Sequence, residues 1–392
     1  MTKVLFISPQ PFFEWRGSPI RVGFNVQALA ELGFEVDLLT LPIGEKREIP
    51  GVTIFRVPNL FGVKKISIGP SLPKVLFDIL LLLRGARLAI KNKYDIIHGV
   101  EDAGIIGVML GKLIKSRVVF EKHSDPFSYK AGYLRNLVLS LYAKVEQLTV
   151  KNSDAVIGTG PGLVKQVREM GTNTPVFHIF DIPSSMVEPS EKAAATIAKR
   201  LKSSEEELLI TFVGSFAVYQ GIDLMFSAVP KVIQANPETR FIIIGGSGEE
   251  IVEKKKILAD QDLNKSVIFL GKVPPDELPN YLAASDILLA PRIAGVNTPL
   301  KLLDYLKVGR AIVATDVEAN TLILDKQTAI LTSAEPSPFA DGICRLLNDA
   351  VLRKTLGSNG KKRYQEKYNF LMFQQRLSDC YRQMLTQNYF ME

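Results

Sequence analysis

Residues 287–316, ILLAPRIAGVNTPLKLLDYLKVGRAIVATD, have the pattern of a buried strand, a loop, an amphipathic helix and a second buried strand. Leu302, Leu303 and Leu306 give the helix one apolar face, and Gly309 is placed to end it as a left-handed residue. The second strand, AIVAT, is apolar almost throughout, as strands inside a parallel sheet are. This stretch therefore predicts an α/β fold.

The same alternation of strands and helices runs through both halves of the 392-residue chain, which is too long for one hydrophobic core. We therefore predict two Rossmann-like parallel-sheet domains with a ligand cleft between them, because such sheets bind ligands outside the carboxyl ends of their strands. The predicted parts are an N-terminal domain over 1–185, a linker over 186–207, a C-terminal domain over 208–363 and a terminal helix over 364–392. The predicted strands are 4–8, 36–41, 53–57, 96–98, 118–121, 155–159, 208–213, 241–244, 267–270, 287–290, 311–315 and 329–331.

Composition excludes several classes of protein. Hydrophobic residues make up 46% and charged residues 23% of the chain, which excludes a disordered or fibrous protein. Cys344 and Cys380 lack disulfide or metal spacing and fit a reducing compartment. The first residues, MTKVLFISPQPFF, have the pattern of a strand rather than a signal peptide, and no apolar stretch approaches the roughly 18–20 residues of a membrane-spanning helix. We therefore expect a cytoplasmic protein.

The net charge of +7 lies mainly in the first half: residues 1–190 contain 23 Lys and Arg against 17 Asp and Glu, and residues 191–392 contain 25 against 24. From Arg56 to Lys93, eight basic residues interleaved with apolar ones are accompanied by only one acid, Asp78. Such a basic segment (56–93) can lie peripherally on an anionic membrane surface, and it is also the pattern of a solvated helix face. No nucleic-acid-binding signature accompanies it, so we expect no nucleic-acid partner.

Residues 297–301, NTPLK, lie where the loop meets the helix, so the free N–H groups of the first turn and the helix dipole favour a phosphate there. Lys301 can reach that phosphate, and Asp304, one turn further on, can accept hydrogen bonds from the two hydroxyls of a ribose. The alternative interpretation is a capped helix with a surface ion pair between these two residues.

Two glycine-containing loops follow the strands at 208–213 and 241–244. Gly214 and Gly221 bracket the first loop, and Gly246 lies in the second. Glycine lets a ligand approach the backbone closely, although many strand-to-helix turns need glycine for their geometry alone. The convergence of these loops with the 297–301 loop on one sheet edge favours a nucleotide site.

In the N-terminal half, polar residues also follow the strands. A loop containing Arg16 and Gly17 follows the first strand, and His98 and His123 end two further strands. Such positions build sites in parallel sheets, but a histidine in an apolar strand is also commonly structural. The chain contains no GxSxG nucleophile elbow and no Walker A sequence, which disfavours acyl transfer and P-loop nucleotide hydrolysis.

Three stretches of the C-terminal half closely resemble the donor-binding domain of the retaining glycosyltransferases of family 4, which have the twin-Rossmann GT-B fold. They are VGSFAVYQGIDLMFSAV (213–229), FIIIGGSGEE (241–250) and VIFLGKVPPDELPNYLAASDILLAPRIAGVNTPLKLLDYLKVGRAIVATDV (267–317). The N-terminal half is similar more loosely, at LAELGFEVDLLT, YDIIHG, EKHSD and SDAVIGTG. The resemblance implies a GT-B fold whose C-terminal helix crosses back to the N-terminal domain.

The resemblance implies that the C-terminal domain binds a nucleotide diphosphate sugar, that the N-terminal domain binds a glycan or lipid-linked acceptor, and that a hexose is transferred with retention of configuration. Combined with the strand-end positions, it gives the following predicted site. Catalytic roles fall to His123, Lys301 and Asp304; donor binding to Gly214, Ser215, Gln220, Gly246, Ser247, Arg292, Asn297, Thr298, Pro299 and Leu300; and acceptor binding to Arg16, Gly17 and His98.

Three positions depart from the family pattern. Val296 replaces the first residue of a paired acidic motif, and Ser215 and Gln220 replace residues that are frequently basic. The charge of the leaving group is then met by Lys301, Arg292 and the helix N-terminus. No DxD-like pair ends a strand, so we expect neither a metal nor another cofactor. A sugar-nucleotide epimerase and a catalytically weak nucleotide-sugar-binding protein are the alternative functions.

Overall fold

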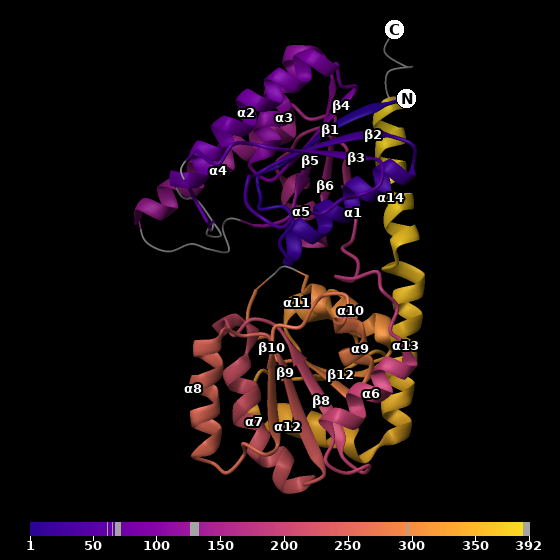
Figure 1. Ribbon diagram of the computed structural model, residues 1–392. Helices are drawn as coiled ribbons and strands as arrows, with labels where there is room; N and C mark the ends of the chain where they lie inside the picture. Colours follow the sequence, from indigo (N-terminus) through magenta and orange to yellow (C-terminus); the bar gives the residue numbers. More distant parts are fainter. Residues whose placement is uncertain (61, 65, 67–71, 126–132, 296–297, 387–392) are drawn as a thin grey trace. The chain divides into compact units, whose positions relative to one another are not determined.

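The computed structural model describes residues 1–60, 62–64, 66, 72–125, 133–295 and 298–386. The chain forms two compact units (Figure 1). The first contains Met1–Asp181 together with the C-terminal segment from Phe370, and the second contains Ile182–Asn369. Each unit is built on its own parallel sheet with helices packed against it, which confirms the predicted α/β architecture of two Rossmann-like domains.

The N-terminal unit contains a seven-stranded parallel sheet in the order β3-β2-β1-β4-β5-β6-β7. Its interior strand β1 pairs with β2 and β4 so that Val4 lies opposite both Val36 and Ile96. The short last strand was not predicted, because three half-buried residues give little periodicity. The strands are β1 (Lys3–Ser8), β2 (Glu35–Thr40), β3 (Val52–Arg56), β4 (Ile96–Val100), β5 (Arg117–Lys122), β6 (Ala155–Gly158) and β7 (Val176–His178).

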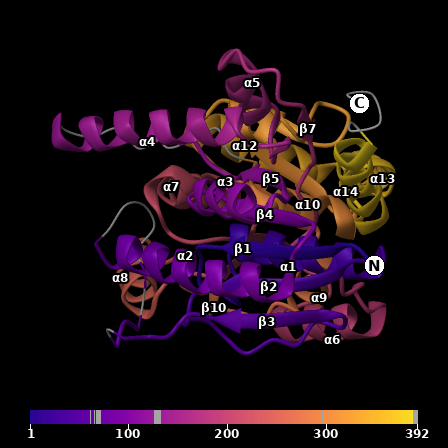
Figure 2. The same ribbon diagram turned by 90° about the horizontal axis from the view of Figure 1, so that it is seen from above.

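Helices cover both faces of this sheet. α1 (Gly17–Glu31) connects β1 to β2. α2 (Leu72–Asn92), α3 (Ala103–Ile114), α4 (Tyr133–Lys151) and α5 (Pro161–Glu169) belong to connections that run the other way along the sheet, so right-handed crossovers place them on the opposite face. Figure 2 shows α2, α3 and α4 as neighbours. Phe77 and Leu81 of α2 are fully buried in the core beneath them.

The C-terminal unit repeats the arrangement with a six-stranded parallel sheet in the order β10-β9-β8-β11-β12-β13. The strands are β8 (Leu208–Val213), β9 (Thr239–Ile244), β10 (Val267–Gly271), β11 (Ile287–Ala290), β12 (Ala311–Thr315) and β13 (Ile330–Thr332). The helices are α6 (Glu191–Leu201), the short 3₁₀ helix η2 (Val218–Gln220), α7 (Ile222–Ala235), α8 (Gly248–Ala259), α9 (Leu278–Ala283), α10 (Leu300–Val308), α11 (Glu318–Thr321), α12 (Pro336–Asn348) and α13 (Ala350–Lys367).

The segment expected to be a linker differs from that expectation. Residues 186–207 contain helix α6, which packs on α9 through Ala194 and Ala283, and the division between the units lies earlier, between Asp181 and Ile182. Part of the Ser, Lys and Glu content of this segment belongs to α6 and its N-cap Ser190, and the rest lies in the loops on either side of the helix.

The final helix, α14 (Phe370–Thr386), packs beside α1 and belongs to the N-terminal unit, as the resemblance implied. The ring centroids of Phe24 and Phe370 are 6.2 Å apart, and the Arg21 guanidinium lies over the Phe373 ring. Among the helices that the structure describes, none is long and apolar enough to cross a bilayer.

Candidate active site

In the C-terminal unit, three loops meet at the carboxyl ends of β8, β9 and β11. β8 and β11 are the neighbours at which the strand order reverses, which is where parallel sheets bind ligands. Two glycines allow the loops to pack so closely: a Cβ atom on Gly221 would lie 1.8 Å from the Pro291 carbonyl oxygen, and one on Gly245 would lie 2.0 Å from that of Gly214. Both glycines also have positive φ. The structure therefore brings together the three loops that the sequence selected.

Lys301, in the first turn of α10, reaches this edge. Its Nζ donates to Gln220 Oε1 at 2.8 Å and lies 4.3 Å from the centroid of the Phe212 ring. Burial, together with the charge of Arg292, lowers the pKa of Lys301 to about 7. Within the described residues Lys301 makes no ion pair with a carboxylate. An anion bound next to this ammonium group would stabilise its charged form.

Arg292 contributes a second cation to the same edge. Its side chain is buried, its Nε donates to the Ala294 carbonyl at 2.7 Å, and its guanidinium lies over the Tyr219 ring at 5.3 Å. The loop thus presents a guanidinium that is fixed by packing before any ligand binds.

The N-terminus of α10 lies beside these cations. Pro299 is the N-cap and Leu300 the first helical residue, and Thr298 before them is half-buried. Among the described residues, no side chain caps the helix. The predicted donor residue Asn297 lies outside the described residues, as does Val296.

Gly246 and Ser247 have structural partners. Ser247 caps α8 in a capping box, in which its Oγ accepts from the Glu250 N–H at 3.3 Å and its own N–H donates to Glu250 Oε2 at 2.7 Å. A Cβ atom on Gly246 would lie 2.7 Å from the Phe216 ring. Ser215 is exposed. Contacts of these three residues with a donor stay predictions.

Asp304 is buried and binds a residue that the sequence did not select. Its Oδ1 accepts hydrogen bonds from the Ser184 N–H at 2.7 Å and from the Ser184 hydroxyl at 3.1 Å. Burial raises the pKa of Asp304 to about 7, against the opposing effects of the Ser184 hydrogen bonds and of Lys307. The ion pair between Lys301 and Asp304 that was the alternative interpretation is not formed, because each side chain has another partner.

The segment that contains Ser184 is anchored a second time, one turn further along α10. The Nζ of Lys307 donates to the carbonyl oxygens of Ser185 at 3.0 Å and Val187 at 2.7 Å, and it lies 3.3 Å from Glu188 Oε1. Helix α10 therefore holds residues 184–188, which follow directly after the boundary between the units.

In the N-terminal unit, His98 occupies a structural position. Its side chain is fully buried; Nδ1 is 2.7 Å from the Tyr381 hydroxyl and Nε2 is 3.1 Å from Glu121 Oε2. Both ring nitrogens are thus engaged inside the core, and the role of His98 in acceptor binding stays a prediction.

Glu121, at the end of β5, is the centre of that network. The Arg21 Nε donates to its Oε1 at 2.5 Å, the Asn25 amide donates to its Oε2 at 2.8 Å, and Arg21 also pairs with Asp181 at 2.9 Å. Burial alone would raise the pKa of Glu121, but the charge of Arg21 holds it well below its usual range. Sequence reasoning missed this residue, although a glutamate within the apolar run VVFEK was a signal for it.

His123, two residues further on, is less completely engaged. Its side chain is 5% exposed, its Nε2 is 3.4 Å from Glu121 Oε1, and its Nδ1 has no hydrogen-bond partner among the described residues. Its backbone N–H donates to Glu101 Oε1 at 2.5 Å, which fixes the loop after β5. His123 thus follows a strand and has ring nitrogens without a hydrogen-bond partner among the described residues; at the end of β7, the same holds for Nε2 of His178.

The remaining predicted acceptor residues follow β1. Arg16 is the N-cap of α1 and pairs with Glu14 at 3.1 Å, and Gly17 is the first helical residue. They lie at the carboxyl edge of the N-terminal sheet, where its strand order reverses between β1 and β4.

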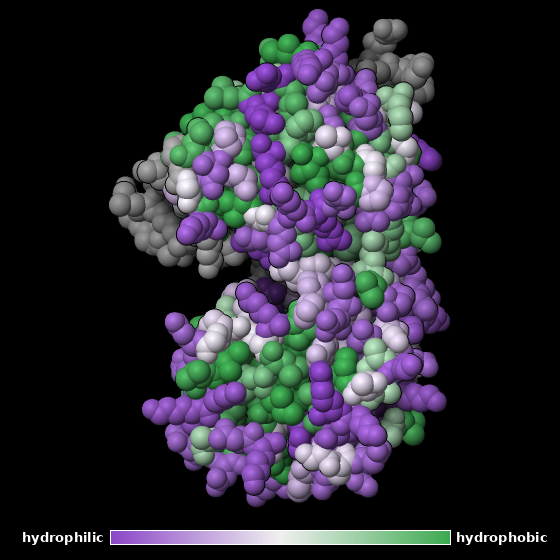
Figure 3. Space-filling view, in the orientation of Figure 1, coloured by the Kyte–Doolittle hydropathy of each residue, from purple (hydrophilic) through white to green (hydrophobic). Residues whose placement is uncertain are grey.

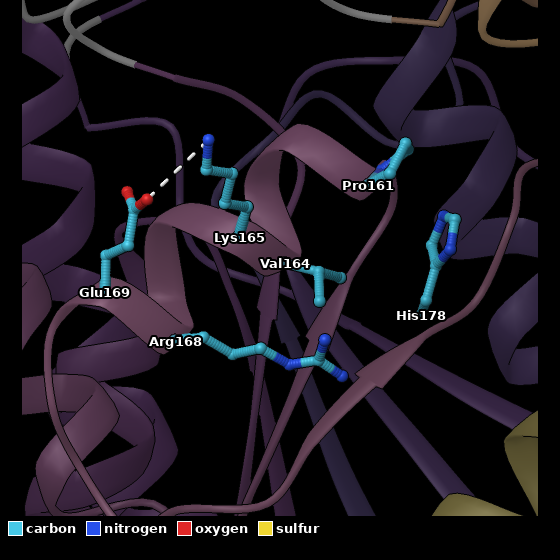
Figure 4. A pocket seen from close by; sticks show the side chains of 6 residues that line it. All are labelled: Pro161, Val164, Lys165, Arg168, Glu169 and His178. Carbon is cyan, nitrogen blue, oxygen red and sulfur yellow. Dashed lines mark ion pairs between the residues drawn. The ribbon is translucent and has the colours of Figure 1, made fainter.

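A shallow hollow of about 500 Å³ lies elsewhere on the N-terminal unit, between α5 and β7 (Figure 4). Lys165, Arg168 and Glu169 line it from the helix, and Lys165 pairs with Glu169 at 3.8 Å. Burial, with the charges of Arg376, Arg21 and Arg168, lowers the pKa of His178 to about 4, so this lining histidine is neutral at pH 7. The hollow contains none of the predicted site residues.

The two Rossmann-like units, each with polar loops at the carboxyl edge of its sheet, define the class of twin-Rossmann GT-B proteins. Two family models match the chain: Glycosyltransferase Family 4 over residues 22–179, and Glycosyl transferases group 1 over residues 207–349. The matches cover most of both units, and the chain belongs to glycosyltransferase family 4. The protein is a glycosyltransferase.

Individual relatives agree with this assignment. An uncharacterized glycosyltransferase of Methanocaldococcus jannaschii is 25% identical over 81% of this chain and 78% of its own length. Sucrose-phosphate synthase from Thermosynechococcus elongatus superposes with a TM-score of 0.80 at 20% identity, covering 98% of this chain and 99% of that one. HepE from Anabaena, solved with UDP-glucose, gives 0.73 at 15% identity over 98% and 100%. The two structural likenesses establish the fold.

Proposed function

We propose that this enzyme transfers a hexose, with retention of configuration, from a nucleotide diphosphate sugar to a glycan or lipid-linked acceptor. One observation carries the proposal: Lys301 is held at the switch point of the C-terminal sheet beside Arg292, with a neutral amide as its hydrogen-bond partner. Two cations next to a helix N-terminus, where backbone N–H groups are free, favour a diphosphate.

The donor fits this edge part by part. The diphosphate is bound by Lys301, Arg292 and the first backbone amides of α10. The glycine at position 221 leaves no side chain between the closely packed loops and the diphosphate. Asp304, three residues after Lys301, is proposed to bind the ribose hydroxyls through Oδ2, the oxygen that does not bind Ser184. HepE, which shares the fold, binds UDP-glucose, so we propose a nucleotide sugar of this class as donor.

The chemistry follows from charge. As the bond between the sugar and the diphosphate breaks, negative charge develops on the leaving oxygen and positive character on the sugar. Preorganised cations and N–H groups stabilise that leaving charge without reorganising during the reaction. We propose that His123 contacts the transferred sugar through Nδ1, which has no partner in the described chain. This scheme assigns the leaving-group charge to protein groups, and we propose that neither a metal ion nor a cofactor takes part.

The acceptor is proposed to bind the N-terminal unit, near Arg16 and Gly17 at the end of β1. Both follow a strand of the same sheet edge as His123. We propose a reducing, cytoplasmic location, supported by Cys344 and Cys380, which are both free thiols.

The test is turnover of UDP-, GDP- and ADP-glucose by the purified protein, with release of the nucleoside diphosphate measured with and without EDTA. We expect one donor to be turned over equally in EDTA, and NMR of the product to show the donor's anomeric configuration. Lys301→Met is expected to lower turnover strongly. Lys231→Met is the matched control, because that exposed lysine pairs with Asp341 and Ser337 on α12, away from the candidate site.

Unchanged turnover in Lys301→Met would overturn the donor site. Donor binding by calorimetry without any turnover or transfer would favour the nucleotide-sugar-binding alternative instead.

A further inference from the structure

Helix α2 has two apolar faces, of which only one is covered. Phe77 and Leu81 lie on the inner face and are fully buried. On the outer face, Val75, Ile79 and Leu83 follow one another at intervals of four residues and are 53%, 49% and 62% exposed. A helix that only covers a sheet needs no second apolar stripe, so this one is unexplained by folding.

The neighbouring helices continue the apolar surface. α3 packs between α2 and α4 on the same face of the sheet, as Figure 2 shows. Its Met109 and Leu113 are half exposed or more, and so are Leu141 and Leu148 on α4. Figure 3 shows apolar patches between charged residues over the part of the unit where α2 and α3 lie. We call the outward sides of α2, α3 and α4 the three-helix face.

The charges on the three-helix face have one sign. The sequences of the three helices contain two acids, Asp78 and Glu146. Glu146 is buried and paired with Lys122, and Asp78 is half-buried. The exposed charged side chains on the described parts of the helices and directly after them are Arg84, Arg87, Lys91, Lys93, Lys112, Lys115, Lys144 and Lys151.

Helix α8 shows what an ordinary solvated helix of this chain looks like. It also has an exposed apolar residue, Val252, but Glu249 and Glu253 lie beside it, and Lys254 pairs with Asp223. Both charge signs are present on that helix. The three-helix face lacks that mixture, so simple solvation does not account for it.

We propose that the three-helix face binds peripherally to a bilayer that contains anionic lipid. The leucine, isoleucine, valine and methionine side chains enter the interface between headgroups and acyl chains, and the arginines and lysines contact lipid phosphates. Exposed aliphatic stripes distinguish this surface from one for nucleic acid, which is recognised by cations and aromatic or polar side chains. The proposed surface includes the basic segment 56–93 and adds the outward sides of α3 and α4. Membrane binding itself does not depend on the proposed function. Only the suggestion that it brings the enzyme to a lipid-linked acceptor rests on the proposed function.

The experiment is flotation of the full chain with vesicles of phosphatidylcholine alone or with 30 mol% phosphatidylglycerol, about that of an anionic membrane surface. We expect at least roughly tenfold stronger binding to the anionic vesicles, weakening with salt. Arg84→Gln/Arg87→Gln/Lys91→Gln is expected to reduce binding about tenfold or more. Ile79→Ser/Leu83→Ser is expected to reduce it similarly and to leave thermal unfolding unchanged, because both side chains are exposed. Val252→Ser on α8 is the matched control.

No binding of the wild type to anionic vesicles at low salt would overturn the proposal. So would a loss caused by the charge variants alone, since that result describes a purely electrostatic surface for another polyanion. The donor assay in detergent keeps this test separate: the face variants are expected to keep wild-type donor turnover, and Lys301→Met is expected to keep wild-type vesicle binding.

Discussion

The carboxyl edges of the two sheets differ in how their buried charges are paired. In the N-terminal unit, Arg21 and Glu121 neutralise each other inside the core, and the histidine beside them is engaged by Tyr381. In the C-terminal unit, Lys301 has the amide of Gln220 as its hydrogen-bond partner. A charge matched within the chain holds the fold together, whereas a cation left without an opposite charge is ready for an anionic ligand. The carboxyl edge of the N-terminal sheet thus holds a charge network that stabilises its unit, and we propose that the carboxyl edge of the C-terminal sheet binds the donor.

The largest effect is expected from Arg21→Met. This substitution leaves Glu121 buried without its cation and should lower the free energy of unfolding of the N-terminal unit by about 3–5 kcal/mol. Urea unfolding measures the loss, with Lys165→Met as control, because that exposed pair with Glu169 should contribute less than about 1 kcal/mol. A loss for Arg21→Met no larger than that of the control would contradict the structural role of the network.

Lys301→Met should give the reverse result. Turnover is expected to fall about 100- to 1000-fold, because the leaving group loses a preorganised cation. Stability should stay the same or rise, since burial already disfavours the charged form of this lysine in the folded state. Thermal unfolding and steady-state kinetics on one preparation separate the two effects. If the variant were strongly destabilised, Lys301 would have a structural role like that of Arg21 and not a binding role.

The pH dependence of donor binding should show both charged residues. Lys301 has a lowered pKa of about 7, and a bound diphosphate raises it, so affinity is full below pH 7 and falls as the pH rises above it. Asp304 has a raised pKa of about 7, and the ribose hydroxyls favour its ionised form, so affinity falls as the pH drops below 7.

Calorimetry with UDP-glucose from pH 5.5 to 9, roughly 1.5–2 units either side of both pKa values, should therefore give an optimum near pH 7. In Lys301→Met the loss of affinity above pH 7 should disappear, and in Asp304→Asn the loss of affinity below pH 7 should disappear. A flat profile in the wild type would argue against both assignments.

The smallest effect is expected from Ser184→Ala. Loss of the hydroxyl that donates to Asp304 Oδ1 should weaken donor binding about five- to tenfold and move the acid fall to higher pH, because the carboxylate loses a stabilising hydrogen bond. Ser190→Ala, which removes the N-cap of α6, is the control: it should lower stability and leave the pH profile unchanged. If the pH profile of donor binding is the same in Ser184→Ala as in the wild type, Ser184 only fixes the position of its own segment and does not affect the ionisation of Asp304.

The sequence predicted what depends on neighbouring residues. A loop that ends at a helix N-terminus is a local pattern, so Lys301 and the glycines before α7 were found from it. The environments of His98 and Asp304 were not, because their partners Tyr381 and Ser184 lie 283 and 120 residues away in the chain. A strand-end histidine has the same sequence pattern whether a core tyrosine or a substrate completes it.

The placement of α14 also bears on how the protein is made. Its Tyr381 hydrogen-bonds His98 in the centre of the N-terminal unit, and its Phe373 lies against Arg21. These residues are translated after the whole C-terminal unit. During synthesis, the first unit to leave the ribosome therefore cannot complete its buried polar network until the second has emerged, and the order of synthesis is the reverse of the order in which the two cores are finished.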